Sequence, residues 1–295
     1  MVYTSIAIGL LAAFCWGTSD YLSRSQSEKV GYYRTVVYSQ MTTLIVILAL
    51  TPFISPNLVA PVSTLIALVA AGVLNFAAFI CLYRAFHSGV VSVVAPVAYT
   101  YPAVTTLLSI AILGSALSSA MILAIAGIIV GVVLLSTRFS ELARSLRGEG
   151  RASLTAGVGL ALGASVFFGT VYIAIGYAAP QVSVVIPVMV LRIVGVAAGF
   201  ALAPILHQEV RPSRLTFSRI MVLMGVLETV GFLSFTFGIA GDVGSLPVVV
   251  AISGMGGAVA ASYGLYFLKE HLEPNQMLGV VLSLLGVFTL LYLGG

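Results

Sequence analysis

Two charged side chains lie near the middle of long apolar segments, Arg192 within residues 182–206 and Glu228 within residues 217–239. An unpaired charge at the centre of a membrane helix costs about 2.5–3.5 kcal/mol, and a facing pair recovers much of this cost. The sequence therefore predicts that Arg192 and Glu228 form an ion pair, either as a clamp between helices or as part of a substrate site. Pairing with arginine keeps a carboxylate ionised, which disfavours Glu228 as a simple proton carrier.

Neutral amides occupy the matching positions in the first half of the chain. A shift of 152 residues places Gln40 on Arg192, and a shift of 153 places Asn75 on Glu228. A cavity with one neutral and one charged pair suits a polar or zwitterionic organic substrate better than a permanently charged one. The alternative is that Gln40 and Asn75 make ordinary interhelical hydrogen bonds, worth about 0.6 kcal/mol each.

Aromatic side chains accompany an acid in the first apolar segment. Trp16 and Asp20 are four residues apart and share one face of a helix. Phe168 and Tyr172 hold the matching positions of the second half, and we expect this aromatic pair at the opposite mouth of the protein. Trp16 and Tyr172 are expected to contact substrate. Asp20 is expected to act as a gate, and the alternative is a surface ion pair with Arg24.

Proline and glycine interrupt two further apolar segments. Helix broken at membrane depth is tolerated only where it faces protein or a water-filled cavity, and paired interruptions in the two halves indicate a binding site. We therefore expect Tyr99, Tyr101 and Ser253 to contact substrate, beside the hinge residues Pro96, Pro102, Pro247, Gly254 and Gly256. The alternative is that proline and glycine are simply commoner in membrane helices.

These residues belong to a chain whose composition requires lipid as its solvent. Hydrophobic residues make up 60% of the 295, only 7% are charged, and the mean hydropathy is +1.15. Segments long enough to cross a hydrocarbon core of about 30 Å are expected at 4–23, 30–51, 62–83, 89–113, 118–136, 154–178, 182–206, 217–239, 244–268 and 275–293.

The ten segments form two sets of five. Trp16-Gly17-Thr18 opens the first set and Phe168-Gly169-Thr170 the second. Because each set is odd-numbered, the second copy is inserted upside down, and inverted repeats are typical of transporters. The predicted fold is an all-α polytopic membrane protein of ten transmembrane helices in two inverted five-helix repeats, at residues 1–137 and 154–295, joined by a cytoplasmic loop at 138–153.

The basic residues predict the orientation. Twelve of the thirteen Lys and Arg residues fall in the odd-numbered loops, and positive residues stay on the cytoplasmic side. We therefore expect a cell membrane protein with both termini outside the cytoplasm. The net charge of +4 favours contact with anionic lipid headgroups over binding of nucleic acid.

Further motifs follow in order along the chain: Tyr101-Pro102, Phe267-Leu-Lys-Glu270, Gly279 and Gly286-Val287. With the repeated Trp/Phe-Gly-Thr, they make the chain resemble the ten-helix EamA-type members of the drug/metabolite transporter superfamily. The chain departs from the family at Gly114-Ser115-Ala116, where a Glu is often found. Members are also commonly drawn with cytoplasmic termini. The resemblance implies a secondary transporter for amino acids, drugs or other small metabolites, working by alternating access, and we expect export. The alternative is a membrane-embedded lipid-handling protein, such as a flippase accessory.

We expect no enzymatic activity, cofactor or metal. The histidines lie near loops, no phosphate loop or HExxH motif occurs, and Cys15 and Cys81 fall in apolar segments. The expected partners are a small-molecule substrate and membrane lipids. Small-residue faces, at Gly127 and Gly131 in the fifth segment and at Gly279 and Gly286 in the tenth, predict that these two helices pack together. The expected state is a monomer, and dimerisation through such a face is the alternative.

Overall fold

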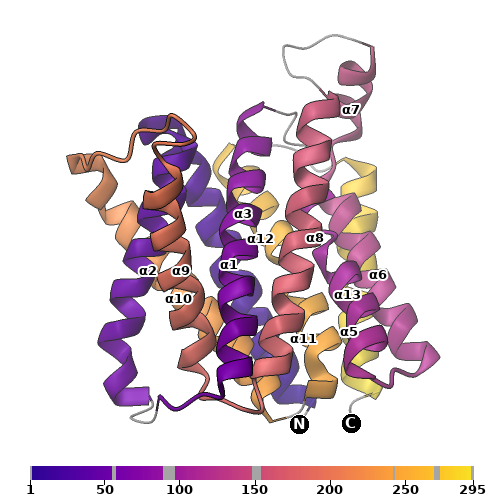
Figure 1. Ribbon diagram of the computed structural model, residues 1–295. Coiled ribbons are helices and arrows are strands. Elements are labelled where there is room, and N and C mark those ends of the chain that lie inside the picture. The colour runs from indigo at the N-terminus through magenta and orange to yellow at the C-terminus, as the bar shows by residue number, and fades with distance from the viewer. Residues whose placement is uncertain are drawn as a thin grey trace.

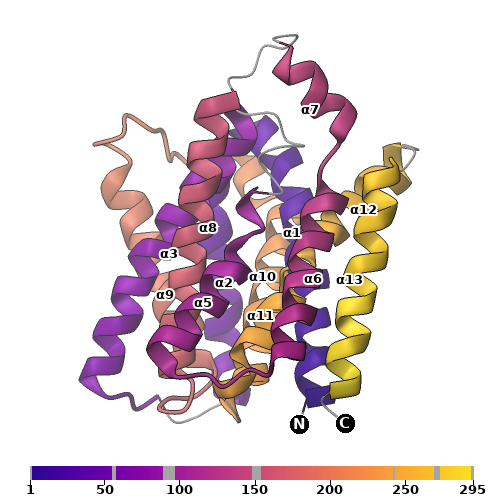
Figure 2. The ribbon, with the colours of Figure 1, turned by 90° about the vertical axis from the view of Figure 1, so that its right-hand side faces the viewer.

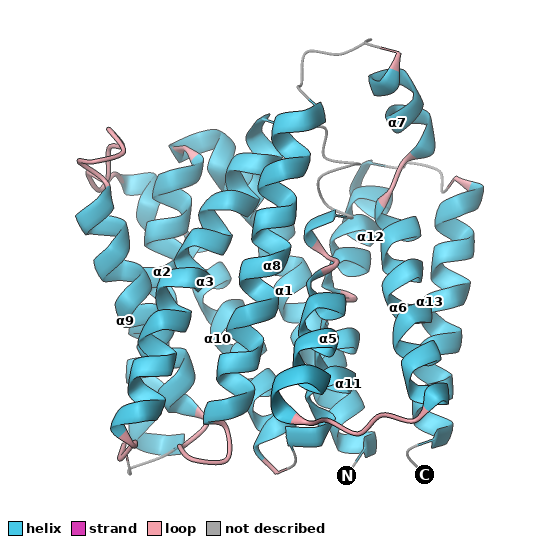
Figure 3. Cartoon of the chain, turned by 45° about the vertical axis from the view of Figure 1, so that its right-hand side comes forward, coloured by secondary structure: helices cyan, strands magenta, loops and turns pink. Residues whose placement is uncertain are grey.

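The computed structural model describes residues 2–54, 58–88, 97–147, 154–241, 243–268 and 273–293, and helices are the only regular elements within these ranges (Figure 3). The helices of the first half are α1 (Val2–Val30), α2 (Tyr32–Ile54), α3 (Val62–Ser88), α5 (Tyr101–Leu113) and α6 (Ser119–Ser136). A short helix, α7 (Phe139–Leu146), lies within the connection predicted at 138–153. The second half consists of α8 (Leu154–Ala178), α9 (Val185–Leu202), α10 (Arg219–Ala240), α11 (Leu246–Ser253), α12 (Gly256–Leu268) and α13 (Pro274–Leu293), with one-turn helices at Arg214–Phe217 and Val243–Ser245.

The long helices stand side by side in one bundle (Figure 1). Both termini lie at one end of the bundle, which we call the terminus face. The link between α1 and α2 and the helix α7 lie at the other end, which we call the loop face (Figure 1). Since α1 runs toward the loop face and α8 runs away from it, the second half is inverted relative to the first.

Six helices are long and apolar enough to cross a membrane: α1, α2, α3, α8, α9 and α10. Shorter apolar helices at Tyr101–Leu113, Ser119–Leu135, Leu246–Ala260 and Pro274–Leu290 fall in the other four predicted segments. Large apolar side chains such as Phe53 and Tyr292 are exposed on the outside of the bundle, as expected where the solvent is lipid. The protein is thus an all-α polytopic membrane protein built from two inverted five-helix repeats.

Helix α1 is longer than the predicted segment 4–23 and continues to Val30. Hydropathy falls at Arg24, but the polar residues that follow keep helical geometry, and Arg24 forms an i,i+4 ion pair with Glu28. Gly31, with φ of +87°, makes the turn into α2, because glycine adopts this conformation without strain.

The two halves interlock instead of folding apart. The main partner of α1 is α10, that of α3 is α8, and α2 packs on α9. Figure 2 shows α6 and α13 side by side at one edge of the bundle. A Cβ atom added to Gly279 would lie 2.5 Å from the Leu135 nitrogen, and one on Gly131 would lie 2.6 Å from the Ser283 nitrogen. The predicted packing of the fifth helix on the tenth is confirmed.

The repeated Trp/Phe-Gly-Thr motif has a packing reason. A Cβ on Gly17 would lie 2.3 Å from the Gly256 carbonyl oxygen, and one on Gly169 would lie 2.6 Å from Val104 Cβ. Each glycine therefore lets the first helix of its half approach the interrupted span of the other half, α12 in one case and α5 in the other. The two interrupted spans are held against the centre of the bundle.

Candidate substrate cavity

A cavity lies between the two halves, and its space, together with the part open to solvent, is about 490 Å³. Its walls come from α1, α3, α5, α8, α10, α11 and α12. The lining residues are Trp16, Asp20, Phe79, Leu82, Ala98, Tyr99, Tyr101, Phe168, Tyr172, Glu228, Phe232, Ser253 and Gly256. Ligand pockets in proteins have this character, a mostly apolar and aromatic wall with a few polar groups.

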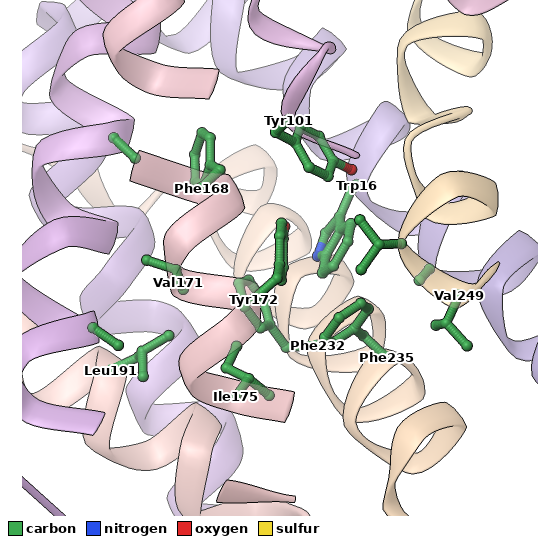
Figure 4. Close-up of a cluster of buried hydrophobic side chains, with 14 of the residues drawn as sticks. Trp16, Tyr101, Phe168, Val171, Tyr172, Ile175, Leu191, Phe232, Phe235 and Val249 are labelled. Atoms are coloured by element: carbon green, nitrogen blue, oxygen red, sulfur yellow. The ribbon is translucent and has the colours of Figure 1, made fainter. Parts of the chain in front are cut away.

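Four rings form an aromatic layer at the centre: Trp16, Tyr172, Phe232 and Phe235. The Trp16 ring centroid lies 5.0 Å from that of Phe232 and 5.7 Å from that of Tyr172, and the Tyr172 and Phe235 centroids are 4.8 Å apart. Figure 4 shows these side chains turned toward one another, Trp16 from α1, Tyr172 from α8 and both phenylalanines from α10. Tilted and edge-on contacts at such distances are favourable, so the layer is a defined wall.

Packed apolar side chains separate the aromatic layer from the terminus face. Helix α8 runs toward that face, so Ile175 lies beyond Tyr172, and α11 begins there with Leu246. Ile175, Leu246 and Val249 are fully buried, and a Cβ on Gly176 would lie 2.7 Å from a Leu246 methyl carbon. The lining residues Asp20 and Leu82 lie toward the loop face, since each follows the middle of a helix that runs in that direction. The cavity is therefore shut off from the terminus face.

Asp20 faces the cavity and not the membrane surface. The Tyr99 hydroxyl donates a hydrogen bond to Asp20 Oδ2 at 2.5 Å. Arg24, the alternative partner considered from sequence, is instead 3.8 Å from Glu28. The alternative of a surface ion pair between Asp20 and Arg24 is therefore wrong. Arg24 lies one helical turn beyond Asp20, and its side chain points away from the cavity toward Glu28.

The predicted ion pair between Arg192 and Glu228 is confirmed. Arg192 Nη2 lies 3.2 Å from Glu228 Oε2, and both side chains are buried. The second guanidinium nitrogen, Nη1, donates to Gln40 Oε1. The guanidinium also lies over the Phe232 ring, 4.3 Å from its centroid. Glu228 lines the cavity, whereas Arg192 and Gln40 lie behind it.

Asn75 is fully buried, and neither its amide nitrogen nor its amide oxygen has a hydrogen-bond partner in the described part of the chain. Gln40 and Asn75 therefore do not form a neutral pair that would correspond to Arg192–Glu228. The Gln40 oxygen accepts a hydrogen bond from Arg192 instead. Asn75 also lies outside the cavity lining.

The predicted hinge residues are placed differently from one another. Gly254 and Met255 separate α11 from α12, and Gly256 begins α12 and lines the cavity. Ser253 lines the cavity and its hydroxyl donates to the Val250 carbonyl at 2.9 Å. Pro102 and Pro247 stand in the first turns of α5 and α11, where a proline removes no helical hydrogen bond, so they begin helices and do not interrupt them. Pro96 lies outside the described residues.

The second aromatic pair is also placed differently from the prediction. Phe168 and Tyr172 line the same central cavity as Trp16, not an opposite mouth, because α8 packs against α3 and α5 at mid-height. Sequence reasoning missed Phe79, Leu82, Ala98 and Phe232 as lining residues. In a helix that is apolar all round, the sequence does not distinguish positions that line a cavity from positions that face lipid. The one available signal was that Phe232 lies one turn after Glu228.

The EamA-like transporter family matches the chain twice, at residues 4–137 and 155–292. The chain belongs to the EamA-like transporter family. This EamA-like protein is thus a membrane transporter of the drug/metabolite transporter superfamily. Each match spans one five-helix half.

Individual proteins also resemble this EamA-like protein. A protein of Methanocaldococcus jannaschii, named "Uncharacterized protein MJ1333.1", is 27% identical over 133 residues, which cover 45% of this chain and 96% of that protein. One solved structure, described as "Crystal structure of protein", superimposes with a TM-score of 0.77 at 17% identity and covers 99% of both chains. This likeness shows that the fold is shared along the whole chain.

Proposed function

We propose that this protein is a secondary transporter that moves a small polar organic molecule with an aromatic or apolar body across the cell membrane by alternating access. The observation that carries the proposal is the cavity between the inverted halves, shut off from the terminus face by the aromatic layer and the packing around Ile175 and Leu246. A substrate held there could not leave toward the terminus face in this conformation, and alternating access requires that one side be closed at a time.

The two interrupted spans supply the moving parts in this proposal. Gly254 and Gly256 flank the break between α11 and α12, and Pro102 begins α5 next to Tyr101. Through Gly17 and Gly169, each interrupted span packs on the first helix of the other half. A shift of one half relative to the other would change both contacts together, closing the loop side of the cavity as the terminus side opens.

The direction that we propose is export. The cavity lies toward the loop face, which carries the basic residues and which the charge bias predicts to be cytoplasmic. Substrate would therefore enter from the cytoplasm and leave at the terminus face.

The test is a flux assay with purified protein in liposomes loaded with a defined mixture of amino acids, amines and aromatic metabolites. At least one water-soluble compound should leave faster than from protein-free liposomes. Tyr101→Ala should reduce this flux while the protein stays monodisperse, because the Tyr101 ring contacts both Tyr172 and Phe168 in the cavity wall.

Tyr292→Ala is the matched control, because Tyr292 is 86% exposed on the lipid-facing surface, and its flux should equal that of the wild type. Scrambling of a labelled phospholipid without flux of any water-soluble compound would contradict the proposal and support the lipid-handling alternative.

A further inference from the structure

We propose that the cavity selects an organic amine in its cationic form, with the ammonium group paired to Asp20 and the apolar body against the aromatic walls. The proposal rests on the proposed function, since it names the substrate class of the same cavity. Two independent features carry it: the balance of charge in the lining, and the faces of the rings.

The lining is acidic. Among the described residues that line the cavity, Asp20 and Glu228 carry carboxylates and none is basic. Glu228 is neutralised by Arg192 at 3.2 Å. Asp20 accepts a hydrogen bond from the neutral Tyr99 hydroxyl, and the described part of the chain gives it no cationic partner. A charge removed from water is costly unless it is paired, so a cationic ligand would supply the missing partner.

The rings of the wall are already used to hold a cation. The Arg192 guanidinium lies over Phe232 at 4.3 Å and near Phe79 at 5.7 Å from the ring centroids, and both rings also line the cavity. Trp16, Tyr101 and Tyr172 add further ring surface to the wall of the same cavity. Attraction between a cation and such rings contributes about 0.5–2 kcal/mol and does not depend on the exact shape of the ligand.

A carboxylate on the ligand would have no counterpart. Arg192 lies behind the lining, with one guanidinium nitrogen donating to Gln40 and the other to Glu228. A carboxylate in the cavity would therefore lie near Asp20 with no cationic side chain of the lining to pair with it, and like charges at close range repel. This separates a simple amine from an amino acid with the same side chain, and it replaces the zwitterionic substrate expected from the sequence.

The only tryptophan of the protein reports binding directly. The chain contains one Trp, and Trp16 lines the cavity. Tryptophan emission of the purified full-length protein can be titrated with four compounds that share a phenyl group on a short alkyl chain: phenethylamine, phenylalanine, 3-phenylpropionate and 2-phenylethanol. Phenethylamine should bind at least about tenfold more tightly than the other three. Equal or tighter binding of phenylalanine or 2-phenylethanol to the wild-type protein would overturn the proposal, whatever the variants show.

Three variants assign the preference to Asp20. Asp20→Asn should bind phenethylamine and 2-phenylethanol equally. Tyr99→Phe, which removes the hydroxyl and keeps the carboxylate, should retain the preference for the amine. Glu28→Gln removes an acid two turns further along α1 whose side chain is 71% exposed, and its binding should match the wild type. A preference for the amine that survives in Asp20→Asn would overturn the assignment.

The outcome is separable from that of the flux assay. Amine-selective quenching without flux in liposomes would refute transport and leave the ligand class standing. Flux of 2-phenylethanol-like or zwitterionic compounds, without selection for the amine, would refute the ligand class and leave transport standing.

Discussion

Arg192 Nη2 lies 3.2 Å from Glu228 Oε2 at a depth where both side chains are buried, so each charge depends on the other. Removing one partner of a buried pair leaves an uncompensated charge and costs about 3–5 kcal/mol, whereas removing both costs less. We expect Arg192→Ala to lower the unfolding temperature in detergent more than the double change of Arg192→Ala with Glu228→Gln. Equal losses in the single and double variants would contradict the pairing.

Gly17 should not tolerate a side chain. The carbonyl oxygen of Gly256 lies 2.3 Å from the position of the added Cβ, and backbone cannot rotate aside, so Gly17→Ala should destabilise by about 1–3 kcal/mol and reduce flux. The control is Gly159→Ala in α8, where nothing lies within 4 Å of the added atom. Thermal unfolding of both variants, with flux in liposomes, measures the difference; equal stability would show that α1 and α12 separate easily.

The stability of the contact between Glu273 and α7 at the loop face should depend on pH. The Ser140 hydroxyl and the Ser140 backbone N–H donate to its carboxylate, and these bonds hold the pKa of Glu273 below its ordinary value. A carboxyl with a lowered folded pKa stabilises the fold above its unfolded pKa of about 4.3, and this contribution is lost as the pH falls through the folded value.

We therefore expect hydrogen exchange in α7 to be faster in Glu273→Gln than in the wild type at pH 7, with the two converging below about pH 4. The exchange must be corrected for its intrinsic pH dependence, and a segment of α1 serves as the internal reference. A difference that persists unchanged at low pH would show that the carboxylate does not hold α7.

The orientation predicted from charge can be checked with two reporters. Both termini lie at one face and α7 at the other (Figure 1), so a reporter active only in the cytoplasm should be silent at the C-terminus and active when inserted after Leu146. The reverse pattern would place the basic loops outside and would change the proposed direction of transport.

The sequence predicts the features that have few physical alternatives. Arg192 and Glu228 each stand alone in an apolar helix, so pairing is the one arrangement that avoids a large penalty. The repeated Trp/Phe-Gly-Thr gives the register of the two halves, and that register makes Gln40 and Arg192 equivalent positions. The hydrogen bond between these two residues was not predicted, because equivalence in the repeat does not show which side chains meet.

The cavity wall is harder to predict. Phe79 and Phe232 line the cavity, yet a helix that is apolar all round does not show which face meets lipid, protein or a cavity. The pairing of Asp20 with Tyr99 joins residues 79 positions apart and depends on how the interrupted fourth span packs. Local spacing suggested Arg24 as the alternative, and only the packing of distant helices identifies the partner.

The bond from Arg192 to Gln40 joins equivalent positions of the two halves, where α2 packs on α9. In an assembly of two identical half-length subunits, a residue at such a twofold contact faces its own copy. Two arginines would repel, and two glutamines, with Asn75 at the place of Glu228, would leave the centre without charge. Joining both halves in one chain lets this position hold two different residues. The acid–base asymmetry at the centre of the protein is thus beyond the reach of a symmetric dimer of either half.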